Sequence, residues 1–253
     1  MSIKDRSTKS VDRRAAGQAT ARSAVYATLS AVLAGDEAGI DAVRLHAVQS
    51  LEGEGRDSEA VRRVRAQLSA VLGRRSNAEL LRSQRSLLPP VESADLPAYE
   101  SAYCGSDIFR QAQQMADIAG VYRAHGLTVG GARRERPDHV AVELEFMAFL
   151  TAKEADALLH LGPDQVRMCR EGQALFLGEH LGRWTPLFAR RLADRADGGP
   201  YRAVAEVLEA WIAAELRGRG VEVARPPEPP NDPLPDVGAS DDGCALDADG
   251  ALG

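Results

Sequence analysis

Cysteine, lysine and aromatic residues are scarce in this chain of 253 residues, which has three cysteines, three lysines and 5% aromatic residues. The cysteines show neither the CxxC nor the Cys/His spacing of a zinc site, and an odd number is a poor framework for disulfides. They are Cys104, Cys169 and Cys244. Their scarcity favours a reducing compartment and makes a disulfide-stapled secreted fold a poor interpretation.

Long apolar runs are absent too, since none approaches the roughly 20 residues that a transmembrane helix needs. Arg13 and Arg14 form a twin-arginine pair, but Arg22 interrupts the stretch after them and no strong apolar segment develops as in an export signal. We therefore expect a cytoplasmic protein that is not exported. Isoleucine and threonine together number eleven, while alanine and arginine abound, and this mixture favours helix over strand.

The charge is unevenly distributed along the chain. The formal net charge is −6, but residues 226–253 hold seven acidic residues and no lysine or arginine, which leaves 30 acidic against 31 basic residues elsewhere. This proline- and aspartate-rich end has no apolar face to bury. We expect a disordered tail over residues 1–14, one all-helical domain over 15–220 and a disordered acidic tail over 221–253. The acidic tail is either a solvated spacer or an arm that contacts a partner.

Apolar residues at helical spacing dominate the middle of the chain and predict an all-α, single-domain bundle of about nine helices. No stretch alternates as a strand does. The expected helices cover residues 25–33, 40–51, 61–72, 77–85, 106–125, 137–160, 163–182, 185–194 and 199–216. Asn77 is a candidate helix cap, and Gly126 a candidate stop. Two irregular stretches remain, a long loop over 86–106 and a loop rich in glycine and arginine over 128–136.

The segment after Pro137 is apolar on most of its circumference and predicts a core helix. Proline suits the first helical position, so Pro137 would open the helix and place Asp138 and His139 in its first turn. This acid–histidine pair is either a polar recognition point or a cap beside a space-filling side chain. His139 and Glu143 share a helix face, but no third ligand stands at a readable spacing, so we expect no metal.

No catalytic constellation is present, and we expect a protein that is not an enzyme. The chain lacks GxSxG, phosphate-loop and dinucleotide-binding motifs, and nothing orients a base toward Cys104. An arginine-rich stretch keeps a helical nucleic-acid-binding or regulatory protein as the alternative, although Tyr26 is the sole aromatic residue before Pro97. These arginines are Arg56, Arg62, Arg63, Arg65, Arg74, Arg75, Arg82 and Arg85.

Four motifs, in order, resemble the TorD/DmsD/NarJ family of molybdoenzyme maturation chaperones. The first is LPP at 88–90 followed by YESAY at 99–103, and the second is MADIAGVYRAHGL at 115–127. The third is ERPDH at 135–139, which runs into ELEFM at 143–147. The last is FLGEHLGRW at 176–184, in which we expect His180 to lie in the core or at its rim. The resemblance covers about residues 20–217. The second motif is most similar to the branch of the family that serves dimethylsulfide, ethylbenzene, selenate and chlorate enzymes.

The resemblance implies an all-helical chaperone without a cofactor. Such a protein would hold the twin-arginine leader of an apo molybdopterin enzyme's catalytic subunit until the cofactor is inserted. Carboxylates such as Glu100, Asp138 and Glu143 would take the arginines by charge-assisted hydrogen bonds, and an apolar groove would take the rest of the leader. The expected site comprises Tyr99, Glu100, Ser101, Tyr103, Glu135, Pro137, Asp138, His139 and Glu143. The client, nucleotide binding, and a monomeric or homodimeric state stay open.

Overall fold

The protein is described from a computed structural model, which covers residues 3–49, 59–89, 96–103, 108–128 and 135–223. Most of the described residues lie in α-helices, with short 3₁₀ and π turns, and the predicted all-α class is confirmed. The helices are α1 (Ile3–Ala34), α2 (Glu37–Gln49), α3 (Glu59–Arg74), α4 (Asn77–Leu87), α5 (Ile108–Ala124), α6 (Val140–Asp156), α7 (Pro163–Phe176), α8 (Gly182–Arg195) and α9 (Pro200–Arg219). The turns are η2 (Glu100–Tyr103), η3 (Ala157–Leu161) and η4 (Leu177–Leu181).

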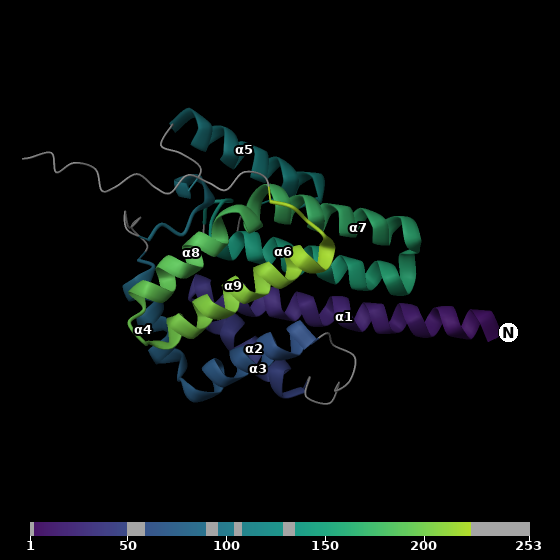
Figure 1. Cartoon of the computed structure of the whole chain (residues 1–253), viewed down its shortest axis with the longest axis horizontal. Coiled ribbons are helices and arrows are strands. Elements are labelled where there is room, and N and C mark those ends of the chain that lie inside the picture. The colour runs from purple at the N-terminus through teal and green to yellow at the C-terminus, as the bar shows by residue number, and fades with distance from the viewer. Residues whose placement is uncertain (1–2, 50–58, 90–95, 104–107, 129–134, 224–253) are drawn as a thin grey trace, which may run out of the picture.

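Helix α6 lies at the centre of the arrangement. The long helix α1 packs along it, α8 pairs with α9 on one side, and α2 and α3 lie below α1 in Figure 1. Along α6 the apolar residues Val140, Leu144 and Met147 are completely buried, as expected of a core helix. One continuous apolar cluster runs from Ala21 to Ile212 and holds the helices together.

The apolar spacing in the sequence correctly located the buried faces of the helices. On α3 the predicted stripe comprises Val61, Val64, Leu68, Val71 and Leu72, and all of these are buried except Val71, which is partly buried. Gly126 takes a positive φ of 78°, and its N–H bonds to the carbonyl of Arg123, so it ends α5 as predicted. No helix within the described ranges is both long and apolar enough to cross a membrane.

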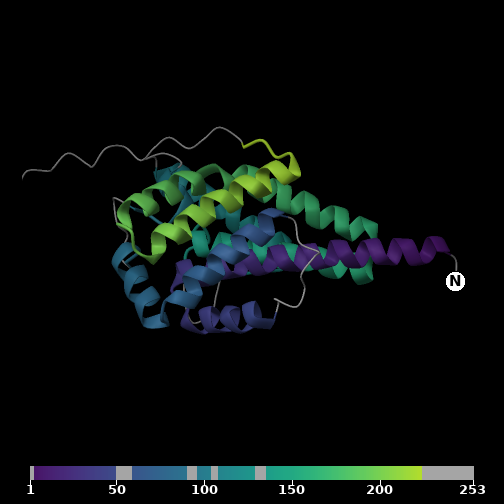
Figure 2. The ribbon, with the colours of Figure 1, turned by 60° about the horizontal axis from the view of Figure 1, so that its bottom comes forward.

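The first helix begins earlier than expected. Residues 3–14 were predicted to be disordered, but they belong to α1, whose end extends past the other helices in Figures 1 and 2. The helix is anchored by buried residues from Ala16 onward, and extending a helix that already exists costs far less than starting one. No proline interrupts this segment. From residue 224 onward, the predicted acidic tail lies outside the described residues. Cys104 and Cys244 also lie outside them.

Helix α4 is capped by Ser76 rather than by Asn77. The Ser76 hydroxyl accepts from the Glu79 N–H at 3.3 Å, and the Glu79 carboxylate accepts from the Ser76 N–H at 2.9 Å. This reciprocal pair is a capping box, which needs glutamate three residues after the cap. Asn77 instead donates to Asp41 at 2.7 Å and helps fasten α4 to α2.

Candidate functional site

Two segments that are distant in the sequence, 98–103 and 135–140, meet beside the start of α6. Tyr99 and His139 form an antiparallel bridge. The N–H of Glu100 donates to the carbonyl of Asp138 at 2.9 Å, and that of Val140 to the carbonyl of Ala98 at 2.8 Å. The structure thus joins the YESAY and ERPDH motifs, which were predicted to contribute to one site.

The bridge also determines where α6 begins. Pro137 was expected to open the helix, but the first helical residue is Val140, and His139 is the N-cap with extended backbone angles of −75° and 138°. Its Nδ1 accepts a hydrogen bond from the Ala141 N–H at 3.2 Å. The extended pairing with Tyr99 holds residues 137–139 outside the helix. The expectation that Asp138 lies in the first helical turn was therefore wrong, and its carboxylate has other partners.

Asp138 is fully buried and binds the guanidinium of Arg136. Its carboxylate accepts from Arg136 Nε at 3.0 Å, from Arg136 Nη2 at 2.9 Å and from the Ser101 N–H at 3.2 Å. The same Nη2 donates to the Ser101 hydroxyl at 2.7 Å, and the guanidinium carbon lies 4.3 Å from the centre of the Tyr99 ring. We call Tyr99, Ser101 and Asp138 the guanidinium cradle. The Arg136 side chain is 35% exposed, so solvent reaches the cradle on this side.

His139 lies against the same tyrosine. The two rings meet edge to face with centres 5.2 Å apart, and the Tyr99 hydroxyl donates to Glu135 at 3.2 Å. Burial lowers the pKa of His139 and outweighs the opposite influence of the Glu135 and Asp138 carboxylates. A neutral imidazole agrees with the role of Nδ1 as an acceptor at the helix start.

Glu100, Glu143 and Tyr103 lie beneath this surface and are fully buried. One Glu100 oxygen is 3.2 Å from Nδ1 of His180, and one Glu143 oxygen accepts from the Trp184 indole N–H at 3.1 Å. The Tyr103 hydroxyl donates to the Pro97 carbonyl at 2.9 Å. These side chains connect the two motif segments to η4 and α8, and none of them faces solvent.

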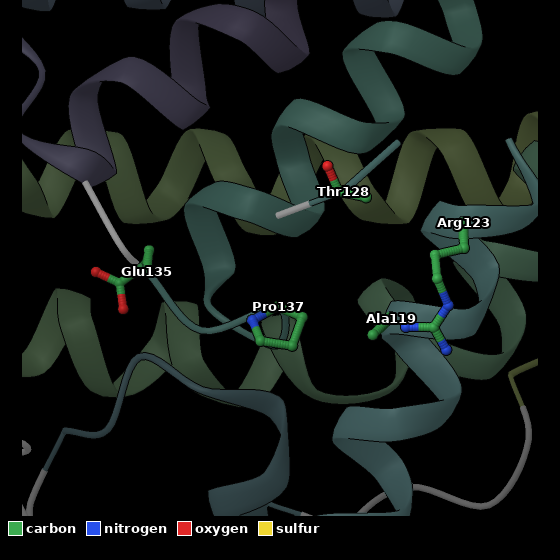
Figure 3. Close-up of a pocket in the computed structure, with 5 residues that line it drawn as sticks. All are labelled: Ala119, Arg123, Thr128, Glu135 and Pro137. Carbon is green, nitrogen blue, oxygen red and sulfur yellow. The ribbon is translucent and has the colours of Figure 1, made fainter. Parts of the chain in front are cut away.

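Beside the cradle, a pocket of about 310 Å³ opens between α5 and the ERPDH segment. Figure 3 shows Pro137 between Glu135 on one side and Ala119 and Arg123 of α5 on the other. The Tyr122 hydroxyl donates to the Pro137 carbonyl at 2.8 Å and holds α5 against this segment. Burial, together with the charges of Glu143 and Glu100, raises the pKa of Tyr122 well above its ordinary value.

Sequence reasoning missed Arg136 and gave His180 no part in the site. Arg136 stands inside the ERPDH motif, but the arginine in the site was expected to come from a partner. His180 was expected at a core or rim position, and it is partly buried at the rim. The spacing of the FLGEHLGRW motif puts His180 and Trp184 on one face of a helix, which was the available signal that both side chains point to the same side of it.

Comparison with known proteins defines the class to which this fold and site belong. The profile of the family described as "Nitrate reductase delta subunit" matches residues 54–190, which is more than half of the chain and includes the joined motifs. The chain belongs to this family.

Curated relatives confirm the predicted resemblance to TorD-like chaperones. A protein named chaperone protein TorD from Vibrio cholerae is 34% identical over 116 residues, covering 45% of this chain and 50% of the relative. The perchlorate reductase assembly chaperone protein of Dechloromonas aromatica is 34% identical over 101 residues, covering 40% and 44%. The selenate reductase assembly chaperone protein of Thauera selenatis is 41% identical over 81 residues, covering 30% and 40%. The chain thus spans about half the length of the Vibrio cholerae protein that it matches.

Proposed function

We propose that this protein is a cytoplasmic chaperone for the apo catalytic subunit of a molybdopterin enzyme. It binds the twin-arginine leader at the amino terminus of that subunit and holds it until the cofactor is inserted. The observation that carries the proposal is the junction of the YESAY and ERPDH segments, which lies inside the family match. Relatives whose names describe assembly chaperones of two reductases support the kind of client.

The chemistry of the site suits such a leader, which has a cationic end followed by an apolar stretch. The rim formed by Tyr99, Glu135 and Pro137 is half-buried and offers an aromatic face and a carboxylate. Asp138, Ser101 and His139 lie directly behind this rim. Glu100, Tyr103 and Glu143 act as positioning residues, since they bind the site segments to the core rather than facing a ligand.

Affinity capture of the tagged full chain from its own host, followed by mass spectrometry, tests the proposal. We expect one uncleaved, twin-arginine-bearing subunit of a molybdopterin enzyme. Recovery of nucleic acid, with an affinity that falls steeply as salt is added, would replace the proposal with the nucleic-acid alternative. Recovery of nothing specific while such a subunit is expressed would also overturn it.

A pair of matched double variants assigns the binding to the site. Asp138→Ala with His139→Ala is expected to weaken the captured leader's binding by about tenfold or more, because charge-assisted contacts are lost. The control, Asp164→Ala with His160→Ala, removes the same residue types from exposed positions on α7 and η3 and should leave affinity unchanged. Equal affinities of the two double variants, both with a native melting curve, would remove Asp138 and His139 from the site.

A further inference from the structure

We propose that Tyr99, Ser101 and Asp138 form a binding site for a guanidinium group, which Arg136 of the same chain occupies until an arginine of the client displaces it. This inference rests on the proposed function and adds the regulation of that site. Arg136 would then be an internal competitor, and the free protein would have its own site closed.

The contacts of Arg136 are those that distinguish a guanidinium from any other cation. Two of its nitrogens bind Asp138 as a fork, at 3.0 and 2.9 Å, and a planar guanidinium matches a carboxylate in this way. The same group stacks on the Tyr99 ring, and the Ser101 hydroxyl accepts from it. An ammonium group is a compact point charge and cannot make the fork and the stacking contact together. The cradle should therefore prefer arginine to lysine.

The cradle also has supporting contacts that do not involve Arg136. The Ser101 N–H donates to Asp138, and the bridge between Tyr99 and His139 sets the spacing of the two segments. The side chain of Arg136 is partly exposed, whereas Asp138 is completely buried. A ligand from solvent would thus meet Arg136 first and must replace it.

Displacement is physically reasonable because one guanidinium replaces another. A buried carboxylate without a partner is costly, so Asp138 needs a cation at all times. Arg136 supplies it in the free protein, and an incoming arginine supplies it in the complex. The exposed pairs elsewhere differ in kind: Arg202 meets Glu206 through a single contact at 3.2 Å, with both side chains more than half exposed.

The first test uses small probes and the full chain. Arg136→Ala should lower the melting temperature, and ethylguanidinium should restore part of that loss, whereas ethylammonium at equal concentration should not. Wild-type protein should gain less from ethylguanidinium than Arg136→Ala at the same concentration, because Arg136 competes for its cradle. Arg136→Ala combined with Asp138→Asn should lose the response. An Arg136→Ala variant that responds equally to both probes would overturn the inference. Should Arg136→Ala fail to fold, Arg136→Gln, which keeps a polar side chain of similar reach, undergoes the same comparison.

The second test measures competition directly, by calorimetry with the peptide Gly-Arg-Arg-Gly amide. We expect it to bind Arg136→Ala about tenfold more tightly than wild type, as if Arg136 filled the cradle about nine-tenths of the time. The lysine peptide Gly-Lys-Lys-Gly amide should show no such gain. Equal binding of the arginine peptide to both proteins would exclude Arg136 as a competitor.

These probes contain no client sequence, so the inference and the proposed function can fail separately. A cradle that responds to the probes while no molybdoenzyme subunit is captured would retain the site and refute the function. A captured leader with a cradle that ignores the probes would retain the function and refute the displacement of Arg136.

Discussion

Arg22 on α1 forms a bidentate ion pair with Glu215 on α9, so that these two helices are joined through a charged contact in the interior. Its Nε donates to Oε1 at 2.9 Å and its Nη2 to Oε2 at 2.5 Å. The same guanidinium donates to Glu154 at 3.1 Å and to Gln173 at 2.9 Å, and Arg219 also donates to Gln173. The Arg22 and Glu215 side chains are 15% and 9% exposed, so the pair lies where water screens it little.

Replacement of Arg22 should therefore be strongly destabilising. Arg22→Met removes the closer of the two arginines that Glu215 and Glu154 share, since Arg219 lies 3.7 Å from each carboxylate. Breaking a buried pair on one side costs about 3 kcal/mol or more. Urea unfolding of the variant measures this loss. The matched control is Arg202→Met, which removes an exposed partner of Glu206 and should cost less than about 1 kcal/mol. Similar losses in the two variants would show that the Arg22 network contributes no more than a surface pair.

Glu154 should make the free energy of unfolding decrease as the pH falls. Burial raises its pKa, but hydrogen bonds from Arg170 and Gln173 and the charge of Arg22 outweigh burial, and the pKa is lower than the ordinary 4.5. The unfolded chain then binds a proton that the folded chain does not, so stability is lost as pH falls below that value. Urea unfolding at about pH 6 and about pH 4 should show a smaller loss in Glu154→Gln than in wild type. An unchanged loss in the variant would contradict this role.

The sequence predicted helices well because burial repeats along a helix at a fixed spacing. The α3 stripe and the fully buried α6 residues lay where periodicity placed them. Ends were harder to predict, since they depend on local competition for hydrogen bonds. Ser76 prevailed over Asn77 because it has Glu79 three residues later. His139 became the cap of α6 because Tyr99, forty residues earlier, pairs with it.

The residues of the candidate site were proposed from family resemblance, but the contacts that they make within the protein were not predicted. Glu100 and Glu143 were expected to meet a ligand, yet their partners are His180 and Trp184 in the interior. Such contacts join residues 80 and 41 positions apart, and no spacing rule predicts them. The network around Arg22 was missed for the same reason, because its helices come together only in the fold.

Protonation of His139 should also lower the stability of the fold as the pH falls. Burial lowers the pKa of His139 below 6.5, so the folded chain resists a proton that the unfolded chain accepts. This contribution to stability is complete above the unfolded value and is lost as pH falls through the folded one. His139→Asn keeps an oxygen that can cap α6 and removes the titration, so the free energy of unfolding should change less between about pH 7.5 and about pH 5.5. His125, whose pKa burial also lowers, should leave a residual slope. A full wild-type slope in His139→Asn would show that His139 does not titrate in this way.

Gly182 should be intolerant of any side chain, because it begins α8 where η4 and α9 approach closely. A Cβ atom on Gly182 would lie 2.4 Å from the Leu177 carbonyl oxygen and 3.1 Å from Leu216 Cδ2. The carbonyl is backbone and cannot rotate away, so Gly182→Ala should destabilise the protein by about 1–3 kcal/mol, as overpacking does. Since η4 also holds His180 against Glu100, the strain would fall on the support of the cradle.

The matched control for that change is Gly218→Ala on α9, where a Cβ would meet nothing within 4 Å. Alanine favours helix over glycine by up to about 1 kcal/mol, so this variant should keep or raise the melting temperature. Thermal melts of the two variants side by side then isolate the contact from the change in helix propensity, which is the same in both. A loss of similar size in both would mean that helix propensity or an effect on the unfolded chain, and not the close approach at Gly182, governs the outcome.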